Sequence, residues 1–120
     1  MAKTILIVED NPDAREMVSI LLAAEGYSVS TAEDGQQALD LVKDSPPDLI
    51  ITDIQMPKVD GIEMIKRIRE LFKSKPMPIV VMSAFGNGKT RDAIEAGANR
   101  SAPKPMQVDS LLNLVRQLLA

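Results

Sequence analysis

Five polar side chains in this sequence each stand at or just after the end of an apolar run: Glu9, Asp10, Asp53, Ser83 and Lys104. If these runs are neighbouring strands of one parallel sheet, their carboxyl ends meet at a single edge, where ligands of α/β proteins bind. Taken singly, Asp53 fits a turn, Ser83 fits a helix cap and Lys104 fits a solvated surface residue. The Glu9-Asp10 pair, taken alone, fits a solvated helix entry. Their joint placement at strand ends instead favours one shared site.

The three acids predict a site for a hard divalent cation. Clustered carboxylates repel one another unless a counter-charge is present. Mg²⁺ supplies that charge, binds one or two carboxylates and leaves positions for water and phosphate oxygens. We expect Asp10 and Asp53 to be direct ligands, together with the main-chain carbonyl of Gln55. Glu9 is expected to hold a metal-bound water.

Asp53 is the expected nucleophile of this site. A carboxylate can attack a phosphoryl group and form an aspartyl-phosphate. Lys104, as a point charge, and Ser83, as a hydrogen-bond donor, would stabilise the oxygens of the transferred group. The sequence therefore predicts a catalytic set of Asp53, Ser83 and Lys104, with phosphorylation on Asp53.

The composition narrows the remaining classes of function. The 120 residues, 45% of them hydrophobic, predict a single domain over residues 1–120. The absence of histidine and cysteine excludes Ser-His-Asp and Cys-His catalysis, the usual zinc sites and disulfides. A net charge of −3, with one tyrosine and two phenylalanines, argues against nucleic-acid binding. No signal peptide or membrane span is apparent, so we expect a cytoplasmic protein with no membrane partner.

The elements that must position these residues follow from hydrophobic pattern and turn residues. Unbroken apolar runs predict buried strands at residues 4–8, 49–53 and 79–82. An alternating run at 27–31 and a weak run at 99–102 predict two edge strands. Met17 and Leu71 stand among the apolar positions that repeat at helical spacing. Helices are expected over residues 12–25, 35–44, about 64–72, 89–96 and about 111–119.

Alternating strands and helices predict an α/β fold with a parallel sheet and helices on both faces. Right-handed crossovers and one topological switch give five strands in the order 2-1-3-4-5, a doubly wound, flavodoxin-like arrangement. In that order the first and third strands are neighbours, so their terminal acids converge.

These residues resemble the receiver domain of two-component response regulators (CheY-like) over essentially the whole chain. The matching segments are Ile7 to Asn11, Asp48 to Pro57, Asp60-Gly61, Ser83-Ala84, Gly97-Ala98 and Lys104-Pro105. The family's chemotaxis member has the strand order 2-1-3-4-5, so that order adds no independent support.

The resemblance implies a phosphorylatable switch in a two-component phosphorelay. A sensor histidine kinase or a histidine phosphotransfer protein would donate a phosphoryl group to Asp53 in a Mg²⁺-dependent reaction. The domain would catalyse this transfer and its own later dephosphorylation, without being a conventional turnover enzyme. Phosphorylation would draw Ser83 toward the phosphoryl group and change the surface presented to an unknown output protein.

Three positions depart from the family pattern, and one of them is Met106, which occupies a place often held by Phe. The fifth strand usually carries Tyr or Phe where this chain has Ser101, so the rotamer switch of that aromatic side chain is missing. Pro103, directly before Lys104, is also unusual in a strand. The output surface is therefore expected to differ from the common one.

Three alternative functions are weighed against this one. Residues 83–90 miss the P-loop pattern G-x-x-x-x-G-K-[ST] at one position, where Ser83 replaces the first glycine. A phosphatase of the haloacid-dehalogenase type would need an acid two residues after the nucleophile, and that residue is Gln55. A degenerate receiver would act as a phosphorylation-independent interaction module, a reading that the loss of the aromatic at Ser101 favours and the intact polar set opposes.

Overall fold

The computed structural model describes residues 2–56, 58–74, 76–84, 89–104 and 107–120, and for Ala84 and Lys104 the main chain alone. Five parallel strands form one sheet in the order β2-β1-β3-β4-β5. The strands are β1 (Thr4–Val8), β2 (Ser28–Ala32), β3 (Leu49–Asp53), β4 (Ile79–Ala84) and β5 (Arg100–Lys104). The predicted topology and fold class are confirmed.

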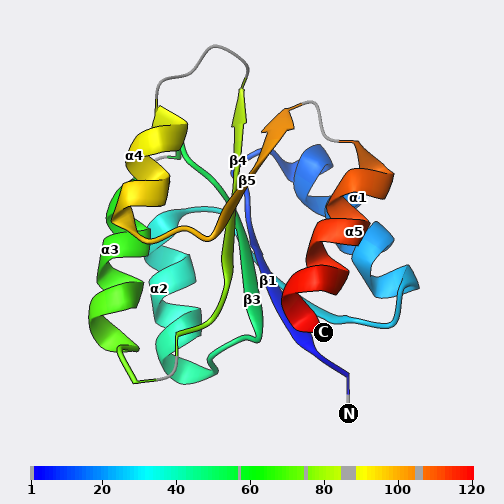
Figure 1. Ribbon diagram of the computed structural model, residues 1–120, viewed down its shortest axis with the longest axis horizontal. Helices are drawn as coiled ribbons and strands as arrows, with labels where there is room; N and C mark the ends of the chain where they lie inside the picture. The colour runs from blue at the N-terminus through cyan, green and yellow to red at the C-terminus, as the bar shows by residue number, and fades with distance from the viewer. Residues whose placement is uncertain (1, 57, 75, 85–88, 105–106) are drawn as a thin grey trace.

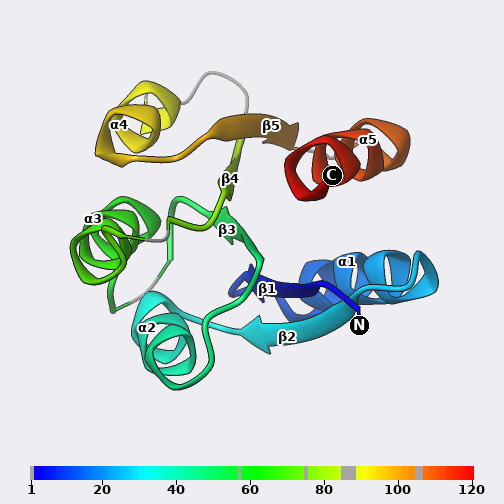
Figure 2. The same cartoon turned by 60° about the horizontal axis from the view of Figure 1, so that its bottom comes forward.

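Each strand is followed by a helix, and the helices cover the sheet in two layers (Figures 1 and 2). Helices α2, α3 and α4 lie on one face, and α1 and α5 lie on the other. Their bounds are α1 (Pro12–Ala24), α2 (Gly35–Asp44), α3 (Gly61–Leu71), α4 (Lys89–Ala96) and α5 (Val108–Leu119). The sheet is thus buried on both sides, which explains why its central strands are apolar without alternation.

Two hydrophobic cores lie on opposite faces of the sheet. Successive residues of β4 point into opposite cores. Ile79 and Val81 belong to the core beneath α2, α3 and α4. Val80 and Met82 belong to the core beneath α1 and α5. This two-residue period is the ordinary geometry of a strand. The same alternation places Ser83 on the face of Val81, the side covered by α4.

Helix starts are fixed by side chains that the sequence makes easy to recognise. Asn11, Asp34 and Asp60 each accept a hydrogen bond from the main-chain N–H three residues ahead, at 3.0, 2.8 and 2.9 Å. Such caps satisfy main-chain donors that the first turn leaves unpaired. α1 ends where Gly26 has φ of 97°, a conformation that a residue with Cβ rarely adopts.

Two apolar positions of the helical patterns do not belong to the cores. Met17 of α1 is 50% exposed and Leu71 of α3 is 51% exposed. Each lies beside the buried stripe of its helix, marked by Val18 and Ile68. A helix on the outside of a sheet buries one stripe, and side chains at its margins remain in water.

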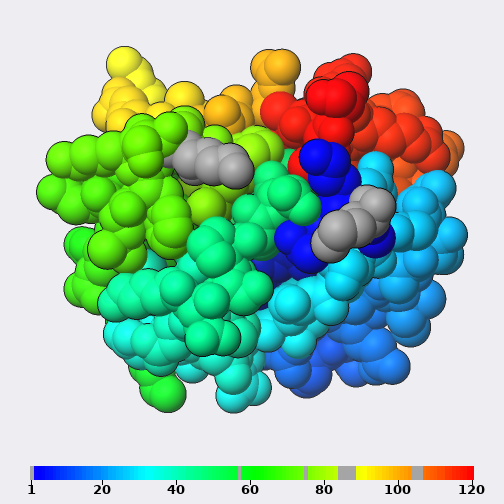
Figure 3. Space-filling model, turned by 90° about the horizontal axis from the view of Figure 1, so that it is seen from below, coloured from blue at the N-terminus to red at the C-terminus, as the bar shows by residue number. Residues whose placement is uncertain are grey.

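The register brings every strand end to one edge of the sheet. Val8 lies opposite Thr52, and Asp53 lies opposite Met82. Ala84 lies opposite Lys104 on the far side of β4. Figure 3 looks onto the other edge, where the strands start and the first residues of the chain (blue) emerge. All the polar residues singled out in the sequence therefore belong to the same edge.

Candidate functional site

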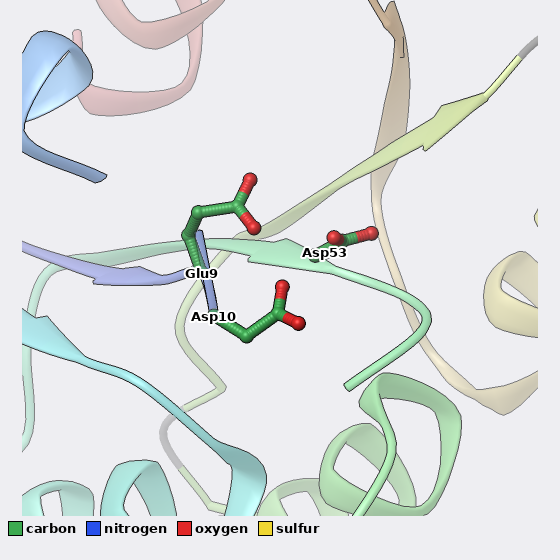
Figure 4. Close-up of side chains that lie close together, drawn as sticks. All are labelled: Glu9, Asp10 and Asp53. Carbon is green, nitrogen blue, oxygen red and sulfur yellow. The ribbon is translucent and has the colours of Figure 1, made fainter. Parts of the chain in front are cut away.

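The three acids of the sequence form a compact cluster at the carboxyl edge of the sheet (Figure 4). Glu9, Asp10 and Asp53 each offer a carboxylate oxygen, and these atoms all lie within 4.8 Å of one another. Glu9 is buried, Asp53 is half-buried and Asp10 is exposed. The cluster is therefore built into the fold on one side and open to solvent on the other.

Glu9 is held in place by its neighbours along α1. Its carboxylate accepts a hydrogen bond of 3.2 Å from the main-chain N–H of Asn11. Its carbonyl oxygen accepts one of 2.9 Å from Arg15 Nη1. The Glu9 N–H in turn donates to the carbonyl of Ala32 in β2. These contacts help to explain how a buried carboxylate keeps a fixed direction.

Asp53 is oriented by the main chain that follows it. The N–H of Ile54 donates a hydrogen bond of 2.7 Å to Asp53 Oδ1. The hydroxyl of Thr52 donates to the Asp53 carbonyl at 2.8 Å. The carboxylate is thus directed by rigid groups at the end of β3, which suits a group that must meet an incoming reactant at one angle.

The loop after β3 is anchored at both of its ends. Gly61 begins α3 and donates a main-chain hydrogen bond of 2.8 Å to the carbonyl of Ile54. Near the middle of the loop, Lys58 has φ of 65° and its Nζ lies 3.5 Å from a carboxylate oxygen of Asp34. The main-chain N–H of Gln37, with help from Lys58 and against the effect of burial, lowers the pKa of Asp34 below its ordinary value of 3.8.

Gln55 lies two residues beyond Asp53 in the bend that follows β3, with its side chain exposed. This position is compatible with the predicted role of its main-chain carbonyl. That role stays a prediction.

Ser83 lies on β4, the strand next to that of Asp53, and Lys104 lies on β5, one strand further out. The hydroxyl of Ser83 is buried and accepts a hydrogen bond of 2.6 Å from Thr90 Oγ1 in the first turn of α4. Lys104 is the last residue of β5, paired with Ala84 through the main chain. The side chain of Lys104, and with it the contact predicted for its ammonium group, lies outside what the structure describes.

Two contacts at this edge were not predicted from the sequence. Thr90 was considered only as the end of a P-loop-like segment, and nothing local indicates that it would contact Ser83. Arg15 lies in α1, six residues after Glu9, and no motif of the sequence indicates its contact with the Glu9 carbonyl. The P-loop alternative itself falls largely on residues 85–88, outside the described chain, while Ser83 is in a strand rather than a loop.

The donor set fits a divalent cation of the Mg²⁺ type. All three groups are hard carboxylate oxygens, which Mg²⁺ prefers to nitrogen or sulfur. Ligand oxygens on opposite sides of Mg²⁺ are about 4 Å apart, because each metal–oxygen distance is about 2.1 Å. Small side-chain adjustments would therefore bring the cluster to ligand distance.

Within the described residues no helix is long and apolar enough to cross a bilayer.

Comparisons with known proteins agree with this geometry. Residues 5–116 match the model of the response regulator receiver domain. The chain is 38% identical over 120 residues to the response regulator MprA of Mycolicibacterium vanbaalenii, covering 99% of this chain and 51% of that protein. It is 36% identical over 114 residues to a 14.6 kDa protein of Leptolyngbya boryana, covering 94% of this chain and 87% of that one. The chain thus spans about half the length of the mycobacterial relative.

Solved structures give the same result. The chemotaxis protein CheY4 of Vibrio cholerae superposes with a TM-score of 0.90 at 31% identity, covering 99% of this chain and 100% of that chain. NtrX of Brucella abortus also gives a TM-score of 0.90, at 33% identity, covering 99% of this chain and 27% of that chain.

Proposed function

Because this chain belongs to the family of response regulator receiver domains, we propose that it is a switch phosphorylated on Asp53. The observation that carries the proposal is the convergence of Glu9, Asp10 and Asp53, whose carboxylate oxygens lie within 4.8 Å of one another. Such a cluster is costly unless it serves to bind a cation. A nucleophilic carboxylate beside a cation site is what phosphoryl transfer to an aspartate requires.

The phosphoryl donor is a phosphohistidine of a sensor histidine kinase or of a histidine phosphotransfer protein. An oxygen of Asp53 forms a bond to phosphorus as the phosphorus–nitrogen bond breaks, and the bonding electron pair leaves with the imidazole nitrogen. The N–H of Ile54, 2.7 Å from Asp53 Oδ1, fixes the rotation of the carboxylate so that its other oxygen can attack.

Asp10, Asp53 and the Gln55 carbonyl would hold Mg²⁺, and Glu9 would hold a water at the ion. When bound, the ion would offset the charge of the acids and of the phosphoryl oxygens. Ser83 donates a hydrogen bond to one of those oxygens, and Lys104 places an ammonium group near another. Hydrolysis of the aspartyl-phosphate by water at the same site returns the carboxylate and releases inorganic phosphate.

Residues 1–120 act as one receiver domain in this proposal, located in the cytoplasm. The signal passes to an output protein or to an output domain through the surface that phosphorylation changes. That surface differs from the family's usual one because Ser101, exposed in β5, stands where an aromatic is common.

A mass measurement tests the proposal directly. The chain is incubated with acetyl phosphate, with and without Mg²⁺, beside the variant Asp53→Asn and the control Asp13→Asn, which removes an exposed acid of α1. We expect one added phosphoryl group in the wild type and in Asp13→Asn with Mg²⁺ and none in Asp53→Asn. No added group from acetyl phosphate or from a histidine-kinase donor would contradict the proposal and favour the phosphorylation-independent interaction module.

A further inference from the structure

A hydrogen bond between two hydroxyl groups links the end of β4 to the start of α4. Thr90 Oγ1 donates to Ser83 Oγ at 2.6 Å, across seven positions in the sequence. Ser83 is buried and Thr90 is partly buried, so water competes weakly for either group. The contact therefore ties a predicted catalytic hydroxyl to a helix that has no other assigned role.

Ser83 lies close to Asp53 as well as to α4. Met82 lies directly opposite Asp53, so Ser83 is one residue past the reactive carboxylate on the neighbouring strand. Its side chain shares the sheet face of Val81, which packs on the α2, α3 and α4 side. Ser83 therefore lies between two sites that its hydroxyl can contact. One is the proposed phosphorylation site at Asp53, and the other is the first turn of α4.

In this bond the Ser83 oxygen accepts, so the proton of Ser83 itself remains available. The Ser83 oxygen turns about a single side-chain torsion, so it occupies one position at a time. Directed toward Thr90, it is turned to α4. Directed toward a phosphoryl group on Asp53, it would make a charge-assisted hydrogen bond, which is stronger than one between neutral hydroxyls. A phosphoryl group therefore competes with Thr90 for Ser83.

We propose that Thr90 is a positioning residue that holds Ser83 in its resting orientation, and that phosphorylation exchanges this bond for one to the phosphoryl group and releases the first turn of α4. The inference rests on the proposed function, because it needs a phosphoryl group on Asp53. The exchange of hydrogen bonds would couple phosphorylation of Asp53 to α4 through Ser83 and Thr90. This coupling needs no aromatic side chain at position 101, where the chain has an exposed serine.

The test compares Thr90→Val, which keeps the shape but removes the hydroxyl, with Thr90→Ser, which keeps the hydroxyl. Thr90→Ala is a second variant without the hydroxyl, should valine disturb the helix start. Acetyl phosphate and Mg²⁺ load the proteins, intact mass reports the loading, and hydrogen exchange is measured on the amides of α4.

We expect phosphorylation to speed exchange at the start of α4 in the wild type and in Thr90→Ser. In Thr90→Val, exchange there should be fast before phosphorylation and change little after it. The equilibrium constant for phosphorylation should rise about threefold to tenfold in Thr90→Val, the effect of losing one hydrogen bond from the resting state. A merely structural bond would leave the phosphorylation equilibrium unchanged.

A double-mutant cycle of Ser83→Ala and Thr90→Val separates the outcomes further. Thermal unfolding should show a coupling between the two positions without phosphate and none once the phosphoryl group is loaded. Equal coupling in both states, with the wild type loaded, would overturn the role of Thr90 and leave the proposed function intact. A wild type that gains no phosphoryl group would instead overturn the proposed function, and the inference with it.

Discussion

The first residue of α3, Gly61, lies directly against the main chain of Asp53. A Cβ placed on Gly61 would overlap the Asp53 carbonyl oxygen and would lie 2.9 Å from Ile54 Cα. Both neighbours are main-chain atoms at the end of a buried strand, so neither can move aside easily. The Asp60-Gly61 pair is thus explained by two needs, a cap for α3 and a close approach to the reactive strand end.

Gly61→Ala should lower both stability and reactivity. We expect a loss of about 1–3 kcal/mol in the free energy of unfolding from the overlap, and slower Mg²⁺-dependent phosphorylation of Asp53 because the strand end must shift. Denaturant unfolding and phosphorylation followed by mass measure the two effects.

Gly26→Ala is the matched control for Gly61→Ala. It strains a residue with φ of 97°, in a turn where an added Cβ meets nothing within 4 Å. Stability should fall by about 1–2 kcal/mol while phosphorylation keeps its wild-type rate. A wild-type rate in Gly61→Ala would show that the close approach does not matter to the site.

Asp10→Asn should change stability in opposite directions with and without Mg²⁺. Without the ion, removing one of three clustered negative charges relieves repulsion and raises the melting temperature. With the ion, the wild type should gain about 1.4 kcal/mol at a Mg²⁺ concentration ten times its dissociation constant, and the variant should gain far less. Thermal unfolding across a Mg²⁺ series measures this, with Glu16→Gln, an exposed acid of α1, as control. Equal Mg²⁺ responses in all three proteins would exclude the cluster as the cation site.

Asp34→Asn should reveal a pH-dependent contribution to stability. The pKa of Asp34 is lowered in the folded chain, so its ionised form stabilises the fold above its unfolded value of 3.8. As pH falls from that value through the lower folded pKa, the contribution is lost. Asparagine keeps a capping oxygen but no charge. The stability advantage of the wild type should therefore be present at pH 7 and vanish in strong acid. A difference that stays constant over this range would contradict the assignment.

Arg69→Met should destabilise the fold far more than Arg67→Met. The guanidinium of Arg69 donates to the carbonyls of Met77 and Gly97 and to Asn99 Oδ1, at distances of 2.7 to 3.0 Å. Burial lowers the pKa of Arg69, yet the group remains charged. Removing it leaves the carbonyls of Met77 and Gly97 without this donor, while Asn99 Oδ1 still accepts from the N–H of Ile79. We expect a loss of about 2–4 kcal/mol.

The control residue, Arg67, pairs with Glu63 at 3.3 Å on an exposed face of α3. Its substitution by methionine should change the free energy of unfolding by no more than about 0.5 kcal/mol. Denaturant unfolding compares the two variants. Similar losses in both would mean that Arg69 contributes mainly by covering surface.

The sequence predicted the fold well because its signals are local and mutually consistent. Caps at Asn11 and Asp34, and a positive-φ glycine at Gly26, mark element ends that depend on a few neighbouring residues. The strand predicted over residues 99–102 runs instead from Arg100 to Lys104 and includes Pro103. On an edge strand a residue needs no N–H toward a further partner, so proline is accepted and the strand continues to Lys104.

Contacts between distant elements were beyond the reach of the sequence. The bond from Thr90 to Ser83 depends on how α4 docks on the sheet, and the hydrogen bonds of Arg69 depend on three segments meeting at once. The acid cluster was accessible to prediction because strand order alone brings its members together. The exposure of Met17 and Leu71 could not be predicted in this way. Helical spacing gives the direction of a buried stripe but not its width.

The parallel sheet also gives the molecule an end that lies away from the acid cluster. Every strand starts at the edge opposite Asp53 (Figure 1). Ser45 is exposed and lies between the end of α2 and the start of β3. The chain contains no cysteine, so Ser45→Cys would introduce its sole thiol. A dye, a bead or a sensor surface attached through that thiol would hold the protein by its far end and leave the edge with the acid cluster and both helical layers facing solvent.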